Sequence, residues 1–433
     1  MTPSTILPQT ASNSKKTIIV VGGGAAGILA AAEAARAGAE VTLFEKNERL
    51  GLKILISGGG KCNLTHEGDV KSILACFRRN ESMFLKASFY KFTNRDFLKI
   101  LNHYGLSTYT RPDGRIFPVE PANAKDVVTV LTRFLEDSDV RVKYNTAVDE
   151  LLITDKRITG VVSNGVPYSA DCVIVTSGGS SYPSTGTTGD GWRWLDQVGH
   201  TIIPLRAALA PIYLALPRPE WSGVALRSIL LRARSSPGGK ELVRWAGDAL
   251  FTHKGLSGPA TLGITREISE ALAEDPTAKP IVECDFFPDK PFECLRDHLL
   301  DWSKNAPRKR VHAFYEDRCP ERLRPELTSA TGVQVDLRAL SLSVKNATRI
   351  VRTVKEWNLG VVRAVPLERG EVVAGGVSLN EVDPQTMQSK LFANLYLAGE
   401  ILDVAGPVGG YNLQAAWSTG AVAGRSAASS NVN

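Results

Sequence analysis

Residues 17–27 read TIIVVGGGAAG, and this stretch decides the fold. Five β-branched residues in succession predict a buried strand, which leads directly into a cluster of glycines. An alanine-rich run over 28–37 then predicts a helix, and residues 40–44 predict a second strand. Strand, glycine-rich turn, helix and strand in this order are typical of the dinucleotide-binding unit of a Rossmann domain, so we expect an α/β fold.

The glycines of this motif have separate expected roles. Gly22 permits the tight turn, Gly24 lets the backbone approach a pyrophosphate, and Gly27 lets the helix pack closely on the strand. The helix N-terminus presents free N–H groups and partial positive charge to the phosphates. Glu45 follows Gly24 by 21 residues, where its carboxylate is expected to accept hydrogen bonds from the adenosine ribose. A glycine-rich turn without a ligand is the alternative.

A second glycine cluster reads SGGGKCN at residues 57–63. Three consecutive glycines favour neither helix nor core, so we expect a loop whose backbone lies against a ligand. Lys53 and Lys61 are expected to neutralise phosphate or steer an anion, with surface solvation as the alternative. Cys62 follows a lysine that would lower a thiol pKa, but we favour a small packing residue.

The end of the chain repeats the order of strand, glycines and helix. Residues 395–398 predict a strand, positions 409–410 are glycines, and residues 415–424 predict a helix. The N-terminus of this helix offers backbone donors, which suit the negative charge that reduced flavin holds near N1 and O2. This arrangement favours FAD, although an ordinary terminal helix packed on a sheet fits the same pattern.

A strand in the middle of the chain supports the same sheet. Residues 171–176 predict a strand that ends in Ser177-Gly178-Gly179, on the side of an open α/β sheet where ligands bind. The polar loop over 180–191 is expected to wall the flavin or the substrate. Alternating residues over 140–145 and 157–162 predict strands of a meander.

The composition excludes several classes of protein. With 433 residues the chain needs two or three domains, and no apolar window is long enough for a transmembrane helix. Residues 1–16 lack the apolar region of a secretory signal, so we expect a disordered leader and a cytoplasmic protein. Six cysteines without CxxC pairs and six scattered histidines predict neither a disulfide framework nor a metal site.

The basic stretch over 304–324 belongs to a chain of net charge +6. A solvated helical face is the favoured interpretation, because no aromatic residues are interleaved for base stacking; a nucleic-acid contact is the alternative. We therefore expect a small-molecule substrate, no membrane and no nucleic acid. The sequence makes no prediction of the oligomeric state.

These blocks together resemble the YhiN-like flavoprotein family, which includes bile-acid reductase-type and aminoacetone oxidase-type proteins. SGGGKCN and GGYNLQ are the most specific of them. The blocks that carry the resemblance lie at residues 21–27, 56–63, 114–118, 178–183, 251–259, 374–377, 398–403 and 409–414.

The resemblance implies a discontinuous Rossmann-type FAD-binding domain with a β-rich, barrel-like insertion and a small helical subdomain. Alternating runs at 228–234 and 241–245 around the turn SSPGGK predict a hairpin within the insertion. The expected boundaries are 17–205 and 371–433 for the FAD domain, 206–290 and 328–370 for the β-rich insertion, and 291–327 for the helical subdomain.

We expect a tightly but noncovalently bound FAD. The candidates for proton handling are His253, Tyr411, Tyr182 and Asp403, each with a structural role as the alternative. The expected cofactor-binding residues are Gly22, Gly24, Ala25, Ala26, Gly27, Glu45, Lys46, Lys53, Ser57, Gly58, Gly59, Lys61, Cys62, Asn63, Ala147, Val148, Ser177, Gly178, Gly179, Gly399, Glu400, Asp403, Gly410, Tyr411, Asn412 and Leu413.

The expected function is hydride transfer between flavin N5 and a small organic substrate. NAD(P)H is the expected transient electron donor, since no second complete GxGxxG motif marks a resident nicotinamide domain. Two alternatives stay open. One is an aminoketone oxidase that uses dioxygen, and the other is a flavoprotein that binds RNA or a protein partner through the basic stretch over 304–324.

Overall fold

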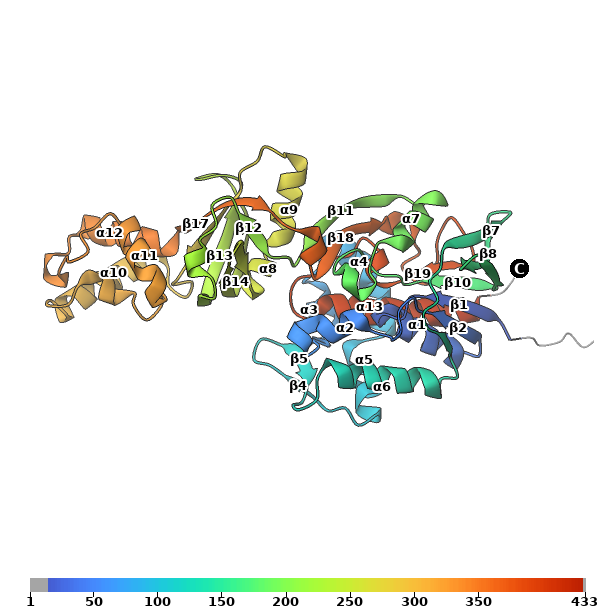
Figure 1. The fold of residues 1–433 in the computed structure, drawn as a ribbon. Helices are drawn as coiled ribbons and strands as arrows, with labels where there is room; N and C mark the ends of the chain where they lie inside the picture. Colours follow the sequence, from blue (N-terminus) through green and yellow to red (C-terminus); the bar gives the residue numbers. More distant parts are fainter. Residues whose placement is uncertain (1–14, 431–433) are drawn as a thin grey trace, which may run out of the picture.

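The computed structural model describes residues 15–430, which form three units in a row (Figure 1). The first unit, called the FAD unit after its expected cofactor, lies at one end and holds both ends of the described chain. A barrel lies in the middle, and a group of helices lies at the far end. Residues 1–14 of the predicted leader lie outside the described residues.

The core of the FAD unit is the parallel sheet that the first motif predicted. Its five strands pair in the order β19-β10-β1-β2-β6, all parallel. The edge strand β6 covers part of 140–145, so these residues belong to the main sheet and not to the expected meander. The strands span Leu395–Leu397 (β19), Cys172–Val175 (β10), Thr17–Val21 (β1), Glu40–Phe44 (β2) and Arg141–Lys143 (β6).

Helices α1 (Ala25–Arg36) and α13 (Tyr411–Ser429) lie side by side against this sheet (Figure 1). Their approach is close because glycines face alanines: a Cβ at Gly420 would lie 2.3 Å from the Ala26 carbonyl oxygen. A larger side chain at Gly420 would therefore push apart the two helices that follow the first and the last glycine motifs. The start of the chain and its end therefore build one site.

The remaining elements of the FAD unit surround this centre. Trp417 of α13 stacks on Phe97 of α5 at 4.3 Å between ring centroids, which ties the outer helices to the core. These elements are α2 (Leu52–Ile56), β3 (Thr65–His66), α3 (Val70–Leu74), α4 (Arg79–Lys91), α5 (Asn94–His103), β4 (Thr108–Thr110), β5 (Arg115–Pro118), α6 (Ala124–Asp137), β7 (Glu150–Thr154), β8 (Arg157–Ser163), β9 (Val166–Ser169) and α7 (Asp190–Gln197).

The middle unit is a closed barrel of antiparallel pairs in the order β12-β15-β14-β13-β16-β17. The predicted hairpin is confirmed as β13 paired with β14. A two-stranded ribbon of β11 (Ile202–Ala208) and β18 (Val372–Val377) carries the chain in and out of the insertion. The barrel elements are β12 (Ile212–Leu214), β13 (Ala225–Arg234), β14 (Glu241–Thr252), β15 (Gly255–Ser257), α8 (Pro259–Leu262), α9 (Thr265–Glu274), β16 (Ile281–Asp285) and β17 (Trp357–Ala364).

The helical unit extends further along the chain than expected. It comprises α10 (Phe292–Asn305), α11 (Arg324–Ala330) and α12 (Val344–Lys355), so most of 328–356 is not β-rich. The Ser343 side chain accepts a hydrogen bond from the Asn346 N–H and caps α12. The buried residues of α12, among them Ile350 and Val354, recur at helical spacing, which overrides the strand preference of β-branched residues.

Candidate functional site

One large cavity of about 550 Å³ lies at the carboxyl ends of the parallel strands. Its walls come from the first glycine turn, the glycine cluster after α2, the N-terminus of α13 and the barrel segment 257–259. Strand ends, loops and helix N-termini converge there because all five strands of the main sheet run the same way. The cavity therefore joins the FAD unit to the barrel.

The first glycine turn has the geometry that a pyrophosphate needs. Gly22 adopts a φ of +101°, and a Cβ there would lie 2.8 Å from the Thr176 carbonyl oxygen. A Cβ at Gly27 would lie 1.8 Å from the Gly22 carbonyl oxygen, so the first turn of α1 can pack this closely on the preceding turn only with glycine at this position. A Cβ at Gly24 meets no protein atom within 4 Å, because this backbone borders the open cavity.

Glu45 holds this turn together from the end of β2. Its carboxylate is buried and accepts hydrogen bonds from the Gly23 N–H at 2.7 Å and from the Asn47 N–H at 2.8 Å. The Asn47 side-chain amide donates a third at 2.6 Å. A carboxylate has about four acceptor positions, so one stays available for a ribose hydroxyl. The structural role of Glu45 was not predicted.

The second glycine cluster forms a tight turn, η1 (Ser57–Gly60), in which Gly58 and Gly59 adopt left-handed backbone conformations. Gly58 has a φ of +57°, and a Cβ there would lie 2.8 Å from the Asn63 nitrogen. Cys62 is fully buried, and burial raises the pKa of its thiol to about 12. Cys62 is therefore a packing residue, whereas the backbone of Ser57, Gly58 and Gly59 faces the cavity.

Three buried polar atoms of residues on the cavity wall lack partners among the described residues. These are Asn63 Oδ1, Ser177 Oγ and Trp194 Nε1. Buried polar atoms are nearly always hydrogen-bonded, so atoms left over in a cavity point to a ligand with donors and acceptors. With the open face of Gly24, they give a wall that fits a dinucleotide such as FAD.

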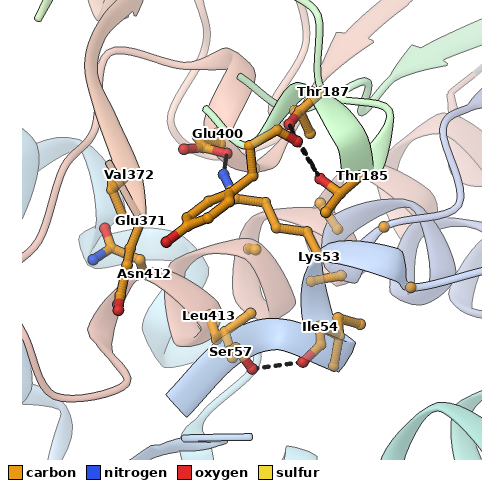
Figure 2. Close-up of a pocket in the computed structure, with 18 of the residues that line it drawn as sticks. Lys53, Ile54, Ser57, Thr185, Thr187, Glu371, Val372, Glu400, Asn412 and Leu413 are labelled. Atoms are coloured by element: carbon orange, nitrogen blue, oxygen red, sulfur yellow. Dashed lines mark hydrogen bonds and ion pairs between the residues drawn. The ribbon is translucent and has the colours of Figure 1, made fainter. Parts of the chain in front are cut away.

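Two ion pairs join residues that line the cavity. Lys53 Nζ lies 2.7 Å from Glu400 Oε2, and Figure 2 shows the two side chains meeting inside the cavity. Lys46 Nζ lies 2.7 Å from Asp190 Oδ2. Lys61, in contrast, pairs with Glu120 at 2.7 Å and does not line the cavity.

The N-terminus of α13 is aimed at the cavity by a side-chain clamp. Asn412 Oδ1 accepts a hydrogen bond from the Gly406 N–H, and its amide donates to the Gly406 carbonyl, both at 2.8 Å. Gly410 adopts a φ of +90°, and a Cβ there would lie 2.6 Å from the Thr65 carbonyl group. Figure 2 shows Asn412 and Leu413 beside Glu371 and Val372 on one side of the cavity.

Of the four proton-handling candidates, only Tyr182 lines the cavity. Tyr411 stacks on His66 at 4.7 Å, and burial raises the pKa of its phenol. Asp403 accepts a hydrogen bond from the Gly375 N–H, and burial raises its pKa. His253 is exposed in the turn between β14 and β15.

Most of the expected cofactor residues come together in the cavity. The exceptions do not line it and contact the site only through packing or neighbouring residues; they are Gly27, Lys61, Cys62, Ala147, Gly179, Asp403 and Tyr411. Residues that were not expected also line it, including Arg111, Arg115, Phe117, Leu209, Leu262 and Glu371. The block at 114–118 carried a signal for two of these positions, Arg115 and Phe117, but nothing in it placed them at a ligand.

Burial determines the direction of the pKa shifts of two acidic groups on the cavity wall, Tyr182 and Glu371. Burial raises the pKa of Tyr182, and the nearby charge of Glu371 adds to this effect, while Arg369 opposes it. Burial also raises the pKa of Glu371, which Lys53 partly offsets. Within the described range 15–430, no cluster of His, Cys, Asp and Glu is placed to hold a metal ion, and no helix is long and apolar enough to cross a membrane.

The Rossmann sheet, the glycine turns and the unpartnered polar atoms together define an FAD-dependent oxidoreductase. The chain belongs to the family described as HI0933-like protein Rossmann domain, whose profile matches residues 16–426.

Named relatives cover nearly the whole chain. It is 31% identical over 401 residues to 3-dehydro-bile acid delta(4,6)-reductase of Clostridium scindens, which is 92% of this chain and 96% of the relative. It is 29% identical over 394 residues to ribosomal RNA dihydrouridine synthase of Escherichia coli, which is 90% of this chain and 92% of the relative.

Solved structures share the fold at low identity. The 3-ketosteroid delta1-dehydrogenase of Sterolibacterium denitrificans matches with a TM-score of 0.53 and 14% identity, covering 96% of this chain and 100% of that chain. Quinol fumarate reductase of Escherichia coli matches with a TM-score of 0.50 and 16% identity, covering 96% of this chain and 70% of that chain. At these identities the likeness concerns the fold alone.

Proposed function

We propose that this protein is a reductase that uses noncovalently bound FAD to reduce a carbon–carbon double bond conjugated with a carbonyl group. The observation that carries the proposal is the continuity of the cavity. The phosphate-binding turn and the barrel segment 257–259 line one space, with Leu209 and Leu262 adding apolar surface. A flat organic substrate held there would lie between the two units, against the flavin.

The names of the relatives support this reaction class. One name describes a reductase for ring double bonds of a 3-dehydro-bile acid, and the other describes the synthesis of dihydrouridine in ribosomal RNA. In a keto-steroid with conjugated double bonds, as in uridine, an electron-poor carbon–carbon double bond stands next to a carbonyl. Its reduction needs one hydride and one proton in both cases.

FAD, when bound, supplies the hydride at N5. The backbone N–H groups at the start of α13, at Asn412 and Leu413, would stabilise negative charge on the ring system. Asn63 and Ser177 supply polar atoms that orient the cofactor. The segment 257–259 covers the cavity from the barrel side and excludes water from the reacting groups.

We assign the proton to Tyr182. Its side chain lines the cavity, and its raised pKa keeps the phenol protonated throughout the physiological range, so it has a proton to donate. Its backbone has a φ of 52°, a left-handed conformation that costs of order 1 kcal/mol in a non-glycine residue and that clusters at functional sites. Glu371, with a raised pKa on the same wall, is the second acid available.

Uridine in RNA is a second candidate substrate, and one surface favours it. Arg308, Lys309 and Arg310 are exposed on the helical unit, and within the described residues their side chains form no ion pair. Exposed, unpaired cations suit the phosphate backbone of nucleic acid. Because this unit lies at the far end of the barrel in Figure 1, it would contact RNA outside the reduced nucleotide.

The experiment is an anaerobic titration of the yellow purified protein with NADH and with NADPH, followed by one oxidant at a time. Rapid loss of the flavin absorbance on addition of a nucleotide would show that the flavin is reduced. Return of this absorbance on addition of a conjugated keto-steroid acid or a uridine-containing RNA would support the reductase. The Tyr182→Phe variant should bleach at the wild-type rate and recolour at least tenfold more slowly. Bleaching by aminoacetone alone, with hydrogen peroxide on readmission of air, would replace this proposal with an amine oxidase.

A further inference from the structure

Four cationic side chains line the cavity, and three of them are already neutralised. Lys46 pairs with Asp190, Lys53 with Glu400 and Arg115 with Asp113. Arg111 lines the same cavity, and within residues 15–430 it has no ion pair. Among the described residues it is thus the cation of the cavity lining that has no carboxylate partner.

The acids nearest to Arg111 are occupied by other cations. Asp113 and Glu120 both feel the charge of Arg111, since it contributes to lowering their pKa values. However, Asp113 Oδ2 lies 2.6 Å from the Arg115 guanidinium, and Glu120 Oε1 lies 2.7 Å from Lys61. Each acid therefore has its own partner, and Arg111 is left to face the cavity.

The guanidinium of Arg111 is held in place by stacking. Its Cζ lies 4.0 Å from the centre of the Phe117 ring, which is buried, and its Nε lies 3.5 Å from the Tyr109 hydroxyl. Stacking fixes the plane of the group and leaves the edge with its N–H donors free. A fixed guanidinium edge binds a carboxylate or a phosphate through two parallel hydrogen bonds.

Arg111 lies on a different element of the cavity lining from the glycine turn at 22–27, which would hold the pyrophosphate of the cofactor. It follows β4 in the small sheet β3-β5-β4, which lies at the barrel side of the FAD unit in Figure 1. The Phe117 ring beneath it is the neighbour of Gly58 in the second glycine cluster, since a Cβ at Gly58 would lie 3.1 Å from the ring.

We propose that Arg111 binds an anionic group of the substrate, a carboxylate or a phosphate, and so fixes the orientation of the reducible ring. This inference rests on the proposed function for the identity of the ring, but the anion site itself does not need the reaction. Arg115 positions the hairpin through Asp113, and Phe117 supplies the flat support. The site selects charged over neutral substrates of the same shape.

The test compares ligand pairs that differ in charge alone. The probes are a conjugated keto-steroid carboxylate against its methyl ester, and uridine monophosphate against uridine. Dissociation constants come from the shift of the flavin absorbance in the FAD-loaded protein. Arg111→Gln should weaken binding of the charged member by about 10- to 100-fold, because it removes a charge-assisted pair of hydrogen bonds, and leave the neutral member unchanged.

Two variants complete the set. Arg111→Lys keeps the charge without the planar fork and should fall between wild type and Arg111→Gln. Arg95→Gln removes the same charge from an exposed position on α5 and should bind every probe as wild type does. The FAD content must be equal in all of these proteins. Loss of FAD in Arg111→Gln would reassign the residue to the cofactor and overturn the proposal.

Further outcomes distinguish the anion site at Arg111 from the proposed reductase activity. Equal weakening of charged and neutral probes, no weakening at all, or no binding of either anionic probe to wild type would overturn the anion site. A charge-specific loss in a protein that reduces no probe would keep the anion site and reject the reductase. A loss confined to the steroid pair or to the uridine pair identifies which anion, carboxylate or phosphate, the site accepts.

Discussion

Arg266 of α9 donates a hydrogen bond to Glu81 Oε1 of α4 across the junction of the two units, at 2.7 Å. The Glu81 side chain is almost completely buried, and the Ala405 N–H donates to the same oxygen at 3.3 Å. Arg266 also donates to the Ala405 carbonyl at 2.7 Å. Since α9 follows the barrel segment 257–259 along the chain, this pair fixes one cavity wall relative to the other.

Replacing Arg266 with methionine should therefore strongly destabilise the protein. The variant leaves a buried carboxylate without its cation, which costs about 3–5 kcal/mol in comparable buried pairs. The Arg266→Met/Glu81→Met double variant should recover much of the loss, because an apolar pair removes the desolvated charge. The measurement is the midpoint of thermal unfolding of the FAD-loaded proteins. A single variant that melts with wild type would contradict the role of this pair.

Two glycines only three positions apart should respond in opposite ways. A side chain at Gly24 meets no protein atom within 4 Å, so Gly24→Val should fold normally yet fail to hold FAD, because it occupies the place of the pyrophosphate. A Cβ at Gly27 would lie 1.8 Å from backbone, so Gly27→Val should fail to fold. Circular dichroism and flavin absorbance separate the two results. A folded Gly24→Val protein with full flavin content would refute the phosphate assignment.

Glu45→Ala should weaken FAD binding less than Gly24→Val. It would remove the proposed ribose contact and free the Gly23 N–H, which is held at 2.7 Å in the wild type, but it blocks no space. Loss of one or two hydrogen bonds to a charged group corresponds to a decrease of about 10- to 100-fold in affinity. Titration of the apoprotein with FAD measures this. Equal loss of FAD in both variants would contradict the ranking.

The sequence predicted the elements that rest on local chemistry. The strand at 17–21 and the glycine spacing after it identify the Rossmann unit, because turn, helix start and phosphate approach each need a particular residue type at a particular place. The cluster at 57–63 was recognised for the same reason. Cys62 was expected both as a packing residue and as a cofactor contact; the thiol is buried and the residue does not line the cavity, which agrees with packing alone.

The rest depended on contacts between distant residues. The availability of Arg111 follows from two ion pairs, of which Lys61–Glu120 joins positions 59 apart. Tyr411 is the first residue of α13, whose N-terminus faces the cavity. Its ring, however, stacks on His66 and does not line the cavity, and nothing in the sequence pointed to this contact. The resemblance implied a β-rich segment over 328–370, whereas residues of one helical face are buried in α12 and the chain forms a helix there.

Exposed cysteines should react with a thiol reagent faster than buried ones. Cys76 and Cys294 are exposed, whereas burial raises the pKa of Cys62 to about 12 and leaves almost no thiolate at neutral pH. Brief treatment of the native protein with iodoacetamide at pH 7.5 should therefore modify the two exposed thiols first. Peptide mapping by mass spectrometry measures the sites. Modification of Cys62 in the folded protein at a rate like that of Cys294 would contradict its burial.

The last prediction concerns pH and a buried histidine near the ribbon of β11 and β18. His200 Nδ1 lies 2.9 Å from Glu381 Oε2, and Nε2 lies 2.9 Å from Ser389 Oγ. The Ser389 oxygen already accepts from the Leu391 and Phe392 N–H groups, so its hydroxyl proton is free to point at Nε2. This network fits the neutral imidazole with its proton on Nδ1.

Burial lowers the pKa of His200 below its ordinary value of 6.5, and Glu381 offsets this only in part. In the unfolded chain the residue takes up a proton near pH 6.5, whereas the folded protein resists it. The unfolded state therefore binds more protons just below pH 6.5, and stability must fall as the pH decreases through this range. Thermal midpoints at pH 7.5 and pH 5.5 measure the effect. His200→Gln cannot titrate, so its midpoint should decrease less than that of wild type, and parallel decreases in the two proteins would show that the imidazole is not held neutral by the fold.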